Sequence, residues 1–218
     1  MASVNDTTLK QEDIFRGNFT QLPKAKPNVF GAESHGFLLN QPLSEADAIA
    51  FERLHSVILP KDYRQFLTCV GNGGAGPFYG IFPLGMMDED FGLREWQEED
   101  GSVGVLTEPF LLEEGWNDLS NMPTADLIDQ NQSEYDRQLE AFDRNYWRTS
   151  LLNGAVPICH EGCALRIWLV VNGAQAGFLW EDSRSEHGGI NPLMLAGGSP
   201  ATFASWYDEW MNACLTER

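Results

Sequence analysis

The stretch LPKDYRQFLTCVGNGGAGPFYGIFPL, residues 59–84, decides the fold of this 218-residue chain. Pro60 suits the first turn of a helix, where its missing N–H costs nothing, and apolar residues then recur at helical spacing. Gly71 stands where a helix would end in a residue with positive φ, and the glycines after it cannot continue a helix. Residues 78–84 are aromatic and β-branched enough for a short strand. The stretch therefore predicts a folding unit of helix, glycine loop and strand.

Residues 71–76, GNGGAG, formally match the G-x-G-x-x-G pattern of dinucleotide-binding loops. Such a loop follows a strand and opens a helix, so that the helix N-terminus faces the pyrophosphate. Here the order is reversed, because the predicted helix comes before the loop and Pro77 follows it. The motif therefore predicts a structural turn, and we expect no cofactor.

Helical periodicity recurs near both ends of the chain. Ser44 precedes two acidic residues and is expected to be the N-cap of a helix. The apolar face of this helix is expected to include Ile49, Leu54 and Ile58. A longer helix is expected over residues 133–147. A final helix opens at Ser199-Pro200 and is expected to carry one apolar stripe, made of Phe203, Trp206, Tyr207, Trp210, Met211 and Cys214.

Strands are expected over residues 155–158, 165–171 and 177–181, the last two joined by a hairpin loop. Because helices and strands do not alternate strictly, the pattern favours an α+β fold over a doubly wound sheet. We expect a single domain with a mixed, mostly antiparallel sheet packed with several helices. This domain is expected to span residues 29–218, after a polar lead-in over residues 1–28.

The order of several short motifs resembles the signature of the SUKH superfamily. Besides the opening stretch, the resemblance rests on residues 30–33, His35, and residues 42–46, 51–52, 107–110, 116–118, 157–163, 169–173, 177–182 and 203–207. Together these motifs cover nearly the whole chain. The superfamily includes fungal regulators of cell-wall synthesis and many bacterial immunity proteins. The resemblance implies a SUKH-like fold and a role as a binding protein rather than as an enzyme.

Composition favours a globular cytoplasmic protein. No run approaches the roughly 20 apolar residues that a membrane helix needs, and the N-terminal residues contain no apolar signal-peptide core. We therefore expect no membrane partner. The four cysteines are expected to be reduced thiols, since no export signal accompanies them.

The negative charge is concentrated in one segment. The chain carries a formal charge of −18, and residues 86–118 hold 11 acids and one base, interleaved with Phe91, Trp96 and Trp116. Two interpretations stay open: a solvated acidic surface, or a docking surface for a basic protein. The same field repels phosphate, so nucleic acid is a poor partner. Residues 88–90 lack the ligand spacing of an EF-hand calcium loop.

Residues 159–163, CHEGC, invite a metal interpretation, because two thiols and an imidazole could ligate zinc. A fourth ligand is missing from the motif, and position 164 is alanine, so the H-E-x-x-H template fails. A turn between two buried strands is the favoured interpretation, and we expect neither a metal site nor catalytic residues. A zinc-dependent enzyme is the remaining alternative that Cys159 and Cys163 leave open.

The preferred hypothesis combines the resemblance with the charge. The protein would be a non-enzymatic immunity protein that occludes the active cleft of a basic toxin domain, such as a nuclease. The alternative, also from the resemblance, is a regulatory or scaffold module related to cell-wall synthesis signalling. The expected partner contacts, taken from the charge pattern, are Asp88, Glu89, Asp90, Glu95, Trp96, Glu98, Glu99, Asp100 and Trp116.

Overall fold

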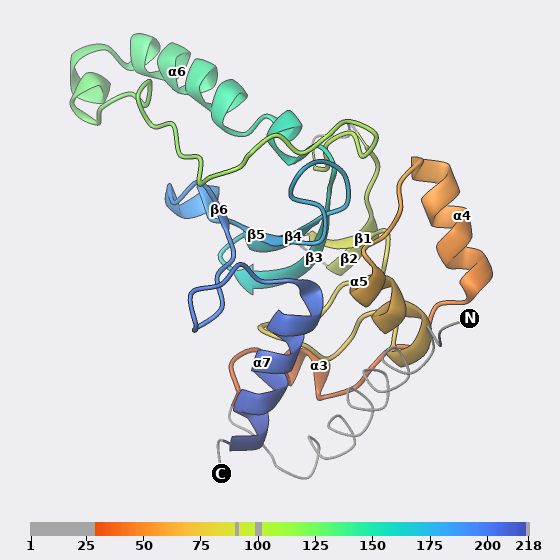
Figure 1. Ribbon diagram of the computed structural model, residues 1–218. Helices are drawn as coiled ribbons and strands as arrows, with labels where there is room; N and C mark the ends of the chain where they lie inside the picture. Colours follow the sequence, from red (N-terminus) through yellow and green to blue (C-terminus); the bar gives the residue numbers. More distant parts are fainter. Residues whose placement is uncertain (1–28, 90–91, 99–101, 217–218) are drawn as a thin grey trace.

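The computed structural model describes residues 29–89, 92–98 and 102–216, so the predicted lead-in over residues 1–28 lies outside the described residues. Two antiparallel sheets form within this part of the chain (Figure 1). The larger has the strand order β3-β4-β5-β6, and the smaller is the hairpin β1-β2. The strands are β1 Met86–Glu89, β2 Gly92–Glu95, β3 Ala155–Gly162, β4 Leu165–Val170, β5 Leu179–Asp182 and β6 Ile190–Pro192. This arrangement confirms the predicted α+β fold.

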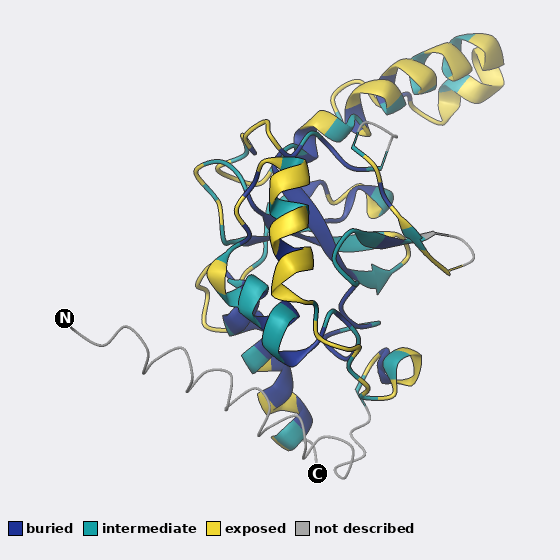
Figure 2. Ribbon diagram, turned by 90° about the vertical axis from the view of Figure 1, so that its right-hand side faces the viewer, coloured by how far each residue is buried: buried dark blue, intermediate teal, exposed yellow. Residues whose placement is uncertain are grey.

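Helices surround the larger sheet (Figure 1). They are α3 Ala32–His35, α4 Glu45–His55, α5 Lys61–Gln65, α6 Asp126–Tyr146 and α7 Phe203–Thr216, with short 3₁₀ turns at Thr149–Leu152 and Arg184–Glu186. Helices α4 and α5 lie side by side, and α5 contacts α7. Helix α6 projects away from the body in both views and is largely exposed (Figures 1 and 2).

The opening stretch folds as predicted at its start and differently at its end. After α5, residues Phe66–Val70 form a π-helical turn that ends at Gly71. Gly71 is extended, with φ −178°, so the predicted positive φ is wrong at this position. A side chain is excluded there for another reason, because a Cβ would lie 2.9 Å from the carbonyl oxygen of Asn40. The positive φ values fall two and three residues later, at Gly73 and Gly74.

The strand predicted over residues 78–84 does not form. Ile81 alone makes isolated bridges, to Gly74 and Cys159, and Phe78 has a positive φ of 52°. The chain folds back on the glycine loop here, with Gly74 and Ile81 exchanging backbone hydrogen bonds of 2.8 and 2.7 Å. The segment therefore closes a compact turn instead of extending a ladder.

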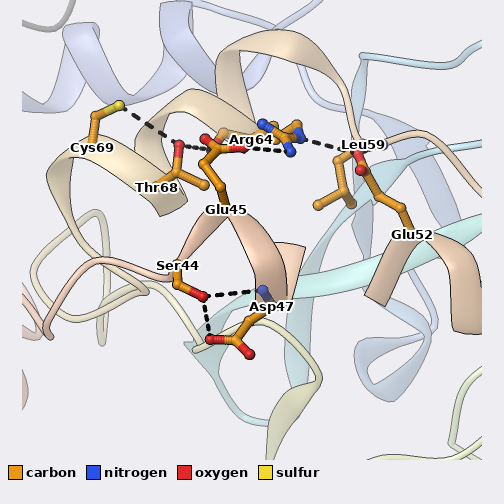
Figure 3. Close-up of polar contacts among 8 residues, drawn as sticks. All are labelled: Ser44, Glu45, Asp47, Glu52, Leu59, Arg64, Thr68 and Cys69. Carbon is orange, nitrogen blue, oxygen red and sulfur yellow. Dashed lines mark hydrogen bonds and ion pairs between the residues drawn. The ribbon is translucent and has the colours of Figure 1, made fainter. Parts of the chain in front are cut away.

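Helix α4 begins at the predicted cap, since the Ser44 hydroxyl accepts the backbone N–H of Asp47 at 3.1 Å (Figure 3). The predicted apolar face is wrong, because Ile49, Leu54 and Ile58 are 38%, 78% and 83% exposed. The inward stripe is instead made of Ala48, Phe51, Glu52 and His55, which also recur at helical spacing. Two of these side chains are polar, so apolar residues alone did not reveal the face.

Arg64 joins α4 to α5 through two carboxylates (Figure 3). Its guanidinium donates to Glu45 at 2.8 Å and to Glu52 at 3.2 Å. Glu52 also accepts the backbone N–H of Leu59 at 3.1 Å, which fixes the turn between the helices. The position of α4 thus depends on polar contacts as well as on packing.

The predicted apolar stripe of α7 is confirmed, since all six of its side chains are at most 9% exposed. The helix itself begins at Phe203, a few residues later than Ser199-Pro200. The buried hydroxyl of Tyr207 donates to the carbonyl oxygen of Ala75 at 2.9 Å. This bond ties the C-terminal helix to the glycine loop of the opening stretch.

Candidate functional site

The predicted contact residues whose side chains the structure describes lie in different environments. Asp90, Glu99 and Asp100 lie outside the described residues, and Glu89 is described only as backbone of β1. The structure places the remaining five in three environments: Asp88 and Glu98 in polar contacts, Trp96 in the core, and Glu95 and Trp116 with solvent access.

Trp96 and Glu98 hold the acidic segment against α4. Trp96 is 5% exposed and packs edge-on against Phe51, with ring centroids 6.0 Å apart. Glu98 lies 2.5 Å from Nδ1 of His55 and accepts the backbone N–H of Leu106 at 3.0 Å. Because its ring is buried, Trp96 has no surface for a partner, and we remove it from the predicted contacts. The Glu98 carboxylate already contacts His55 and the Leu106 N–H, so Glu98 is a poor candidate for a partner contact.

Asp88 is paired with Arg166 and contacts the imidazole of His160, both from the larger sheet. Its carboxylate accepts Nε of Arg166 at 2.9 Å and lies 3.2 Å from Nδ1 of His160. Glu95 is exposed, and the described residues offer it no ion pair. Of these two predicted contacts, Glu95 therefore offers an exposed carboxylate, whereas the Asp88 carboxylate is already paired within the fold.

A loop over residues 111–116, which we name the acidic loop, holds two carboxylates that pair with no described residue. Its two ends are fixed by backbone pairing: Phe110 bridges Gly173, and Trp116 exchanges hydrogen bonds of 2.8 Å with Ile190. The buried ring of Phe110 packs against Trp180 at 4.8 Å. Both ends of the loop are therefore held by backbone pairing, and its middle faces solvent.

The acidic loop combines charge with apolar surface. Glu113 and Glu114 are exposed and form no ion pair with any described residue. Leu111 is 78% exposed, and the loop lines a hollow of about 680 Å³. Trp116 is half-buried and packs against Tyr146 in a tilted arrangement, with ring centroids 5.4 Å apart, and the guanidinium of Arg148 lies over its ring, also at 5.4 Å. Sequence reasoning counted Glu113 and Glu114 among the acids but did not place them among the contacts.

A second feature, which we name the charged cleft, lies between the larger sheet and the β1-β2 hairpin. It has a volume of about 510 Å³ and is lined by Asp88, Arg94, His160, Arg166, Trp168, Asp182 and Arg184, together with Met87, Ser102, Trp147, Thr149, Leu152 and Ala164. Strand register explains part of this lining, because His160, Arg166 and Asp182 are directly opposite on three adjacent strands. The larger sheet therefore presents a row of charged and imidazole side chains to the cleft.

Most charges of the cleft are paired. Arg184 is 4% exposed and donates two parallel bonds to Asp182, at 2.8 and 2.7 Å, and a third to the carbonyl oxygen of Tyr146 at 2.9 Å. Burial lowers the pKa of His160, although the nearby Asp88 carboxylate opposes this shift. The imidazole is therefore mainly neutral at pH 7.

Glu161 on β3 is a half-buried carboxylate that forms no ion pair with a described residue. Burial, reinforced by repulsion from Glu181, raises the pKa of Glu161 to about 7. Glu181 itself accepts a hydrogen bond from the hydroxyl of Ser183. The described residues thus hold acids in three distinct states: paired, exposed, and half-buried without a cation.

The cysteine motif separates in the structure. Cys159 is buried within β3, and burial raises the pKa of its thiol, which disfavours the thiolate that a metal requires. Cys163 is exposed in the two-residue turn to β4, with φ 50° there and 63° at Ala164. The turn is therefore shorter than predicted, because Cys159 to Gly162 belong to the strand. Within the described ranges, no three histidine, cysteine or acidic residues gather as a metal site would require.

Among the helices that the structure describes, none is both long and apolar enough to span a membrane.

Comparison with known proteins identifies the family. Comparison with curated proteins found no match, and comparison with solved structures found none. The profile of the SMI1 / KNR4 family (SUKH-1) matches residues 42–187, well over half of the chain, and this range includes both the acidic loop and the charged cleft. The protein therefore belongs to the SMI1 / KNR4 family (SUKH-1).

Proposed function

We propose that this protein is a non-enzymatic immunity protein that neutralises a cationic toxin domain by covering its active cleft. Membership of the SMI1 / KNR4 family supports an immunity-like or cell-wall-related module with a protein partner, and the family is generally non-catalytic. The choice of toxin neutralisation between these two roles is our own, and it rests on the acidic loop.

The observation that carries the proposal is the pair of exposed, unpaired carboxylates of Glu113 and Glu114 beside apolar surface. Exposed carboxylates without internal partners act at long range and accelerate the encounter with a cationic protein. Leu111 and Trp116 then provide the short-range contacts that charge alone does not supply. Because the loop is anchored at Phe110 and Trp116, little conformational entropy is lost on binding.

Occlusion explains how such a surface neutralises an enzyme without chemistry. A toxin that cleaves nucleic acid needs a cationic cleft for phosphates, and the two carboxylates would take the place of those phosphates. Glu95 is also exposed and unpaired among the described residues, and it is a further contact in this proposal. Asp88, whose charge is satisfied by Arg166, is expected to contribute less.

The test requires a neighbouring reading frame that encodes a secreted protein with a basic C-terminal domain. This basic domain is then the toxin domain used in the experiment. Co-expression with the wild-type chain should restore growth of cells that make the toxin domain. Glu114→Lys should weaken this protection, whereas Glu33→Lys, which makes the same charge change on an exposed residue of α3, should not.

Each result has a distinct meaning. If Glu114→Lys protects as well as Glu33→Lys and the wild type, the acidic loop does not take part in the interface. Failure of the wild-type chain to protect, with no complex formed, would contradict the immunity role and favour the cell-wall-related alternative.

A further inference from the structure

The charged cleft contains polar groups that no described residue satisfies. Trp168 is 2% exposed, and its indole N–H is buried without a hydrogen-bond partner among the described residues. The same is true of Nε2 of His160, on the neighbouring strand β3. Buried polar atoms normally have partners, so the Trp168 indole N–H, which lines this cavity, is open to an acceptor from another molecule.

The guanidinium of Arg166 is also only partly used. Its Nε bonds to Asp88 and its Nη1 reaches the carbonyl oxygen of Ala164 at 3.4 Å, while Nη2 has no acceptor in the described part of the chain. An arginine fork with free donors recognises a planar carboxylate well. Arg166 and Trp168 lie on one strand, β4, two residues apart, and so share a face of the sheet.

The charged groups of the lining disfavour a polyanion. The lining holds three arginines and two aspartates, and each aspartate is paired with an arginine. The two aspartates, Asp88 and Asp182, would repel a polyanion such as a polyphosphate. A single carboxylate matches the geometry of the Arg166 guanidinium.

Apolar walls indicate the rest of the ligand. Met87, Trp147 and Leu152 line the same cleft, and Trp147 is 44% exposed. Its ring is held by the guanidinium of Arg184 at 5.1 Å, so it forms an ordered wall. A volume of about 510 Å³ accommodates a carboxylate together with an aromatic or aliphatic body.

From these observations we propose that the charged cleft is a binding site for an organic monocarboxylate. The carboxylate accepts hydrogen bonds from Arg166 and the Trp168 indole, and the apolar body packs against Trp147 and Leu152. The site is separate from the acidic loop and opposite to it in charge preference. Its existence does not depend on the immunity role, and each proposal can fail without the other.

The test is an NMR titration of the ¹⁵N-labelled full chain with three probes that share one apolar body. Phenylacetate carries the carboxylate, phenylacetamide is its neutral counterpart, and benzylammonium carries the opposite charge. Phenylacetate should shift the indole N–H signal of Trp168 and the backbone amides of His160 and Arg166. Phenylacetamide should bind about tenfold more weakly, and benzylammonium should leave these signals unchanged.

Variants locate the site. Arg166→Gln should weaken phenylacetate binding about tenfold. If that variant unfolds because Asp88 loses its partner, Asp88→Asn/Arg166→Gln removes the charged pair without changing the net charge, and the same loss is expected. Arg144→Gln, an arginine of α6 outside the cleft, should bind like the wild type. Equal binding of all three probes, or phenylacetate shifts that avoid the cleft, would overturn the proposal, as would the absence of any shift.

The carboxylate could belong to a free metabolite or to an acidic side chain of the partner protein. Repeating the titration on a complex with the toxin domain distinguishes these sources. Retained phenylacetate shifts assign the cleft to a free small molecule, whereas their loss assigns it to a carboxylate of the bound partner.

Discussion

The acidic loop and the charged cleft use the same kinds of side chain for opposite purposes. In the loop, Glu113 and Glu114 face solvent with no ion pair among the described residues. In the cleft, Asp88 and Asp182 are each held by an arginine, at 2.9 Å and at 2.8 and 2.7 Å. The formal charge of −18 does not distinguish these carboxylates, whereas the presence or absence of a paired arginine does.

The difference implies a division of roles. A buried or half-buried carboxylate that is paired with a cation stabilises the fold. Its removal leaves the cation without a counter-charge. An exposed carboxylate without a cation contributes little to stability but acts at a distance on a charged partner. Substitutions in the two regions should therefore affect different measurements, stability in one and association in the other.

The largest expected effect is on the buried pair Asp182–Arg184. Asp182→Asn leaves an almost fully buried guanidinium without its counter-charge, and should lower the free energy of unfolding by about 3–5 kcal/mol. Urea unfolding followed by far-UV circular dichroism measures this loss. Asp182→Asn/Arg184→Met should recover part of it. A loss below about 1 kcal/mol would place this pair with ordinary surface ion pairs.

A smaller effect is expected at Glu98, which belongs to the same acidic segment but is engaged within the fold. Glu98→Ala removes the acceptor of the Leu106 N–H and the partner of His55, and should cost about 1–3 kcal/mol in the same unfolding experiment. Glu95→Ala, an exposed neighbour without an ion pair among the described residues, is the matched control and should leave the urea midpoint unchanged. Equal midpoints for the two variants would refute a structural role of Glu98.

Glu161 tests the third environment, a half-buried carboxylate with no cation among the described residues. Its pKa of about 7 in the folded protein exceeds the ordinary value of 4.5, so the folded state holds this proton more tightly than the unfolded state. The resulting stability is present below pH 4.5 and is lost as the pH rises through about 7. Glu161→Gln does not titrate, so its stability relative to wild type should be higher at pH 8 than at pH 5.

Thermal unfolding at the two pH values measures this difference, with Glu186→Gln as an exposed control. A Glu161→Gln variant whose offset from wild type is the same at both pH values would show that the carboxyl is not perturbed by burial.

The smallest effect on stability is expected in the acidic loop. Glu113→Gln/Glu114→Gln removes two exposed charges that no described residue pairs with, so the urea midpoint should not move. A clear destabilisation would mean that these carboxylates hold the loop in place, and would erase the contrast with the cleft.

Periodic and local features of the fold could be predicted from the sequence. The stripe of α7 and the cap at Ser44 follow from spacing and from a hydroxyl in the right place, and both are confirmed. The face of α4 could not be predicted from apolar residues, because Glu52 and His55 point inward to polar partners. Gly71 was correctly seen as a required glycine, but the requirement is steric and comes from Asn40, which belongs to another segment.

The site was harder to predict because pairing depends on distant residues. Asp88 meets Arg166 across 78 positions, and Glu98 meets His55 across 43. Composition located the acidic segment but gave no sign of which acids these partners would neutralise. Register on the larger sheet, which aligns His160, Arg166 and Asp182, is likewise absent from local sequence, so the charged cleft was not foreseen.

The central claim is that the unpaired carboxylates of the acidic loop recognise a cationic protein. The most direct test is the association rate with the toxin domain, measured by stopped-flow fluorescence at low and high salt. Glu113→Gln/Glu114→Gln should slow association several-fold at low salt and flatten the salt dependence, whereas Glu33→Gln should match the wild type. Wild-type association rates and salt dependence in the loop variant would contradict the claim.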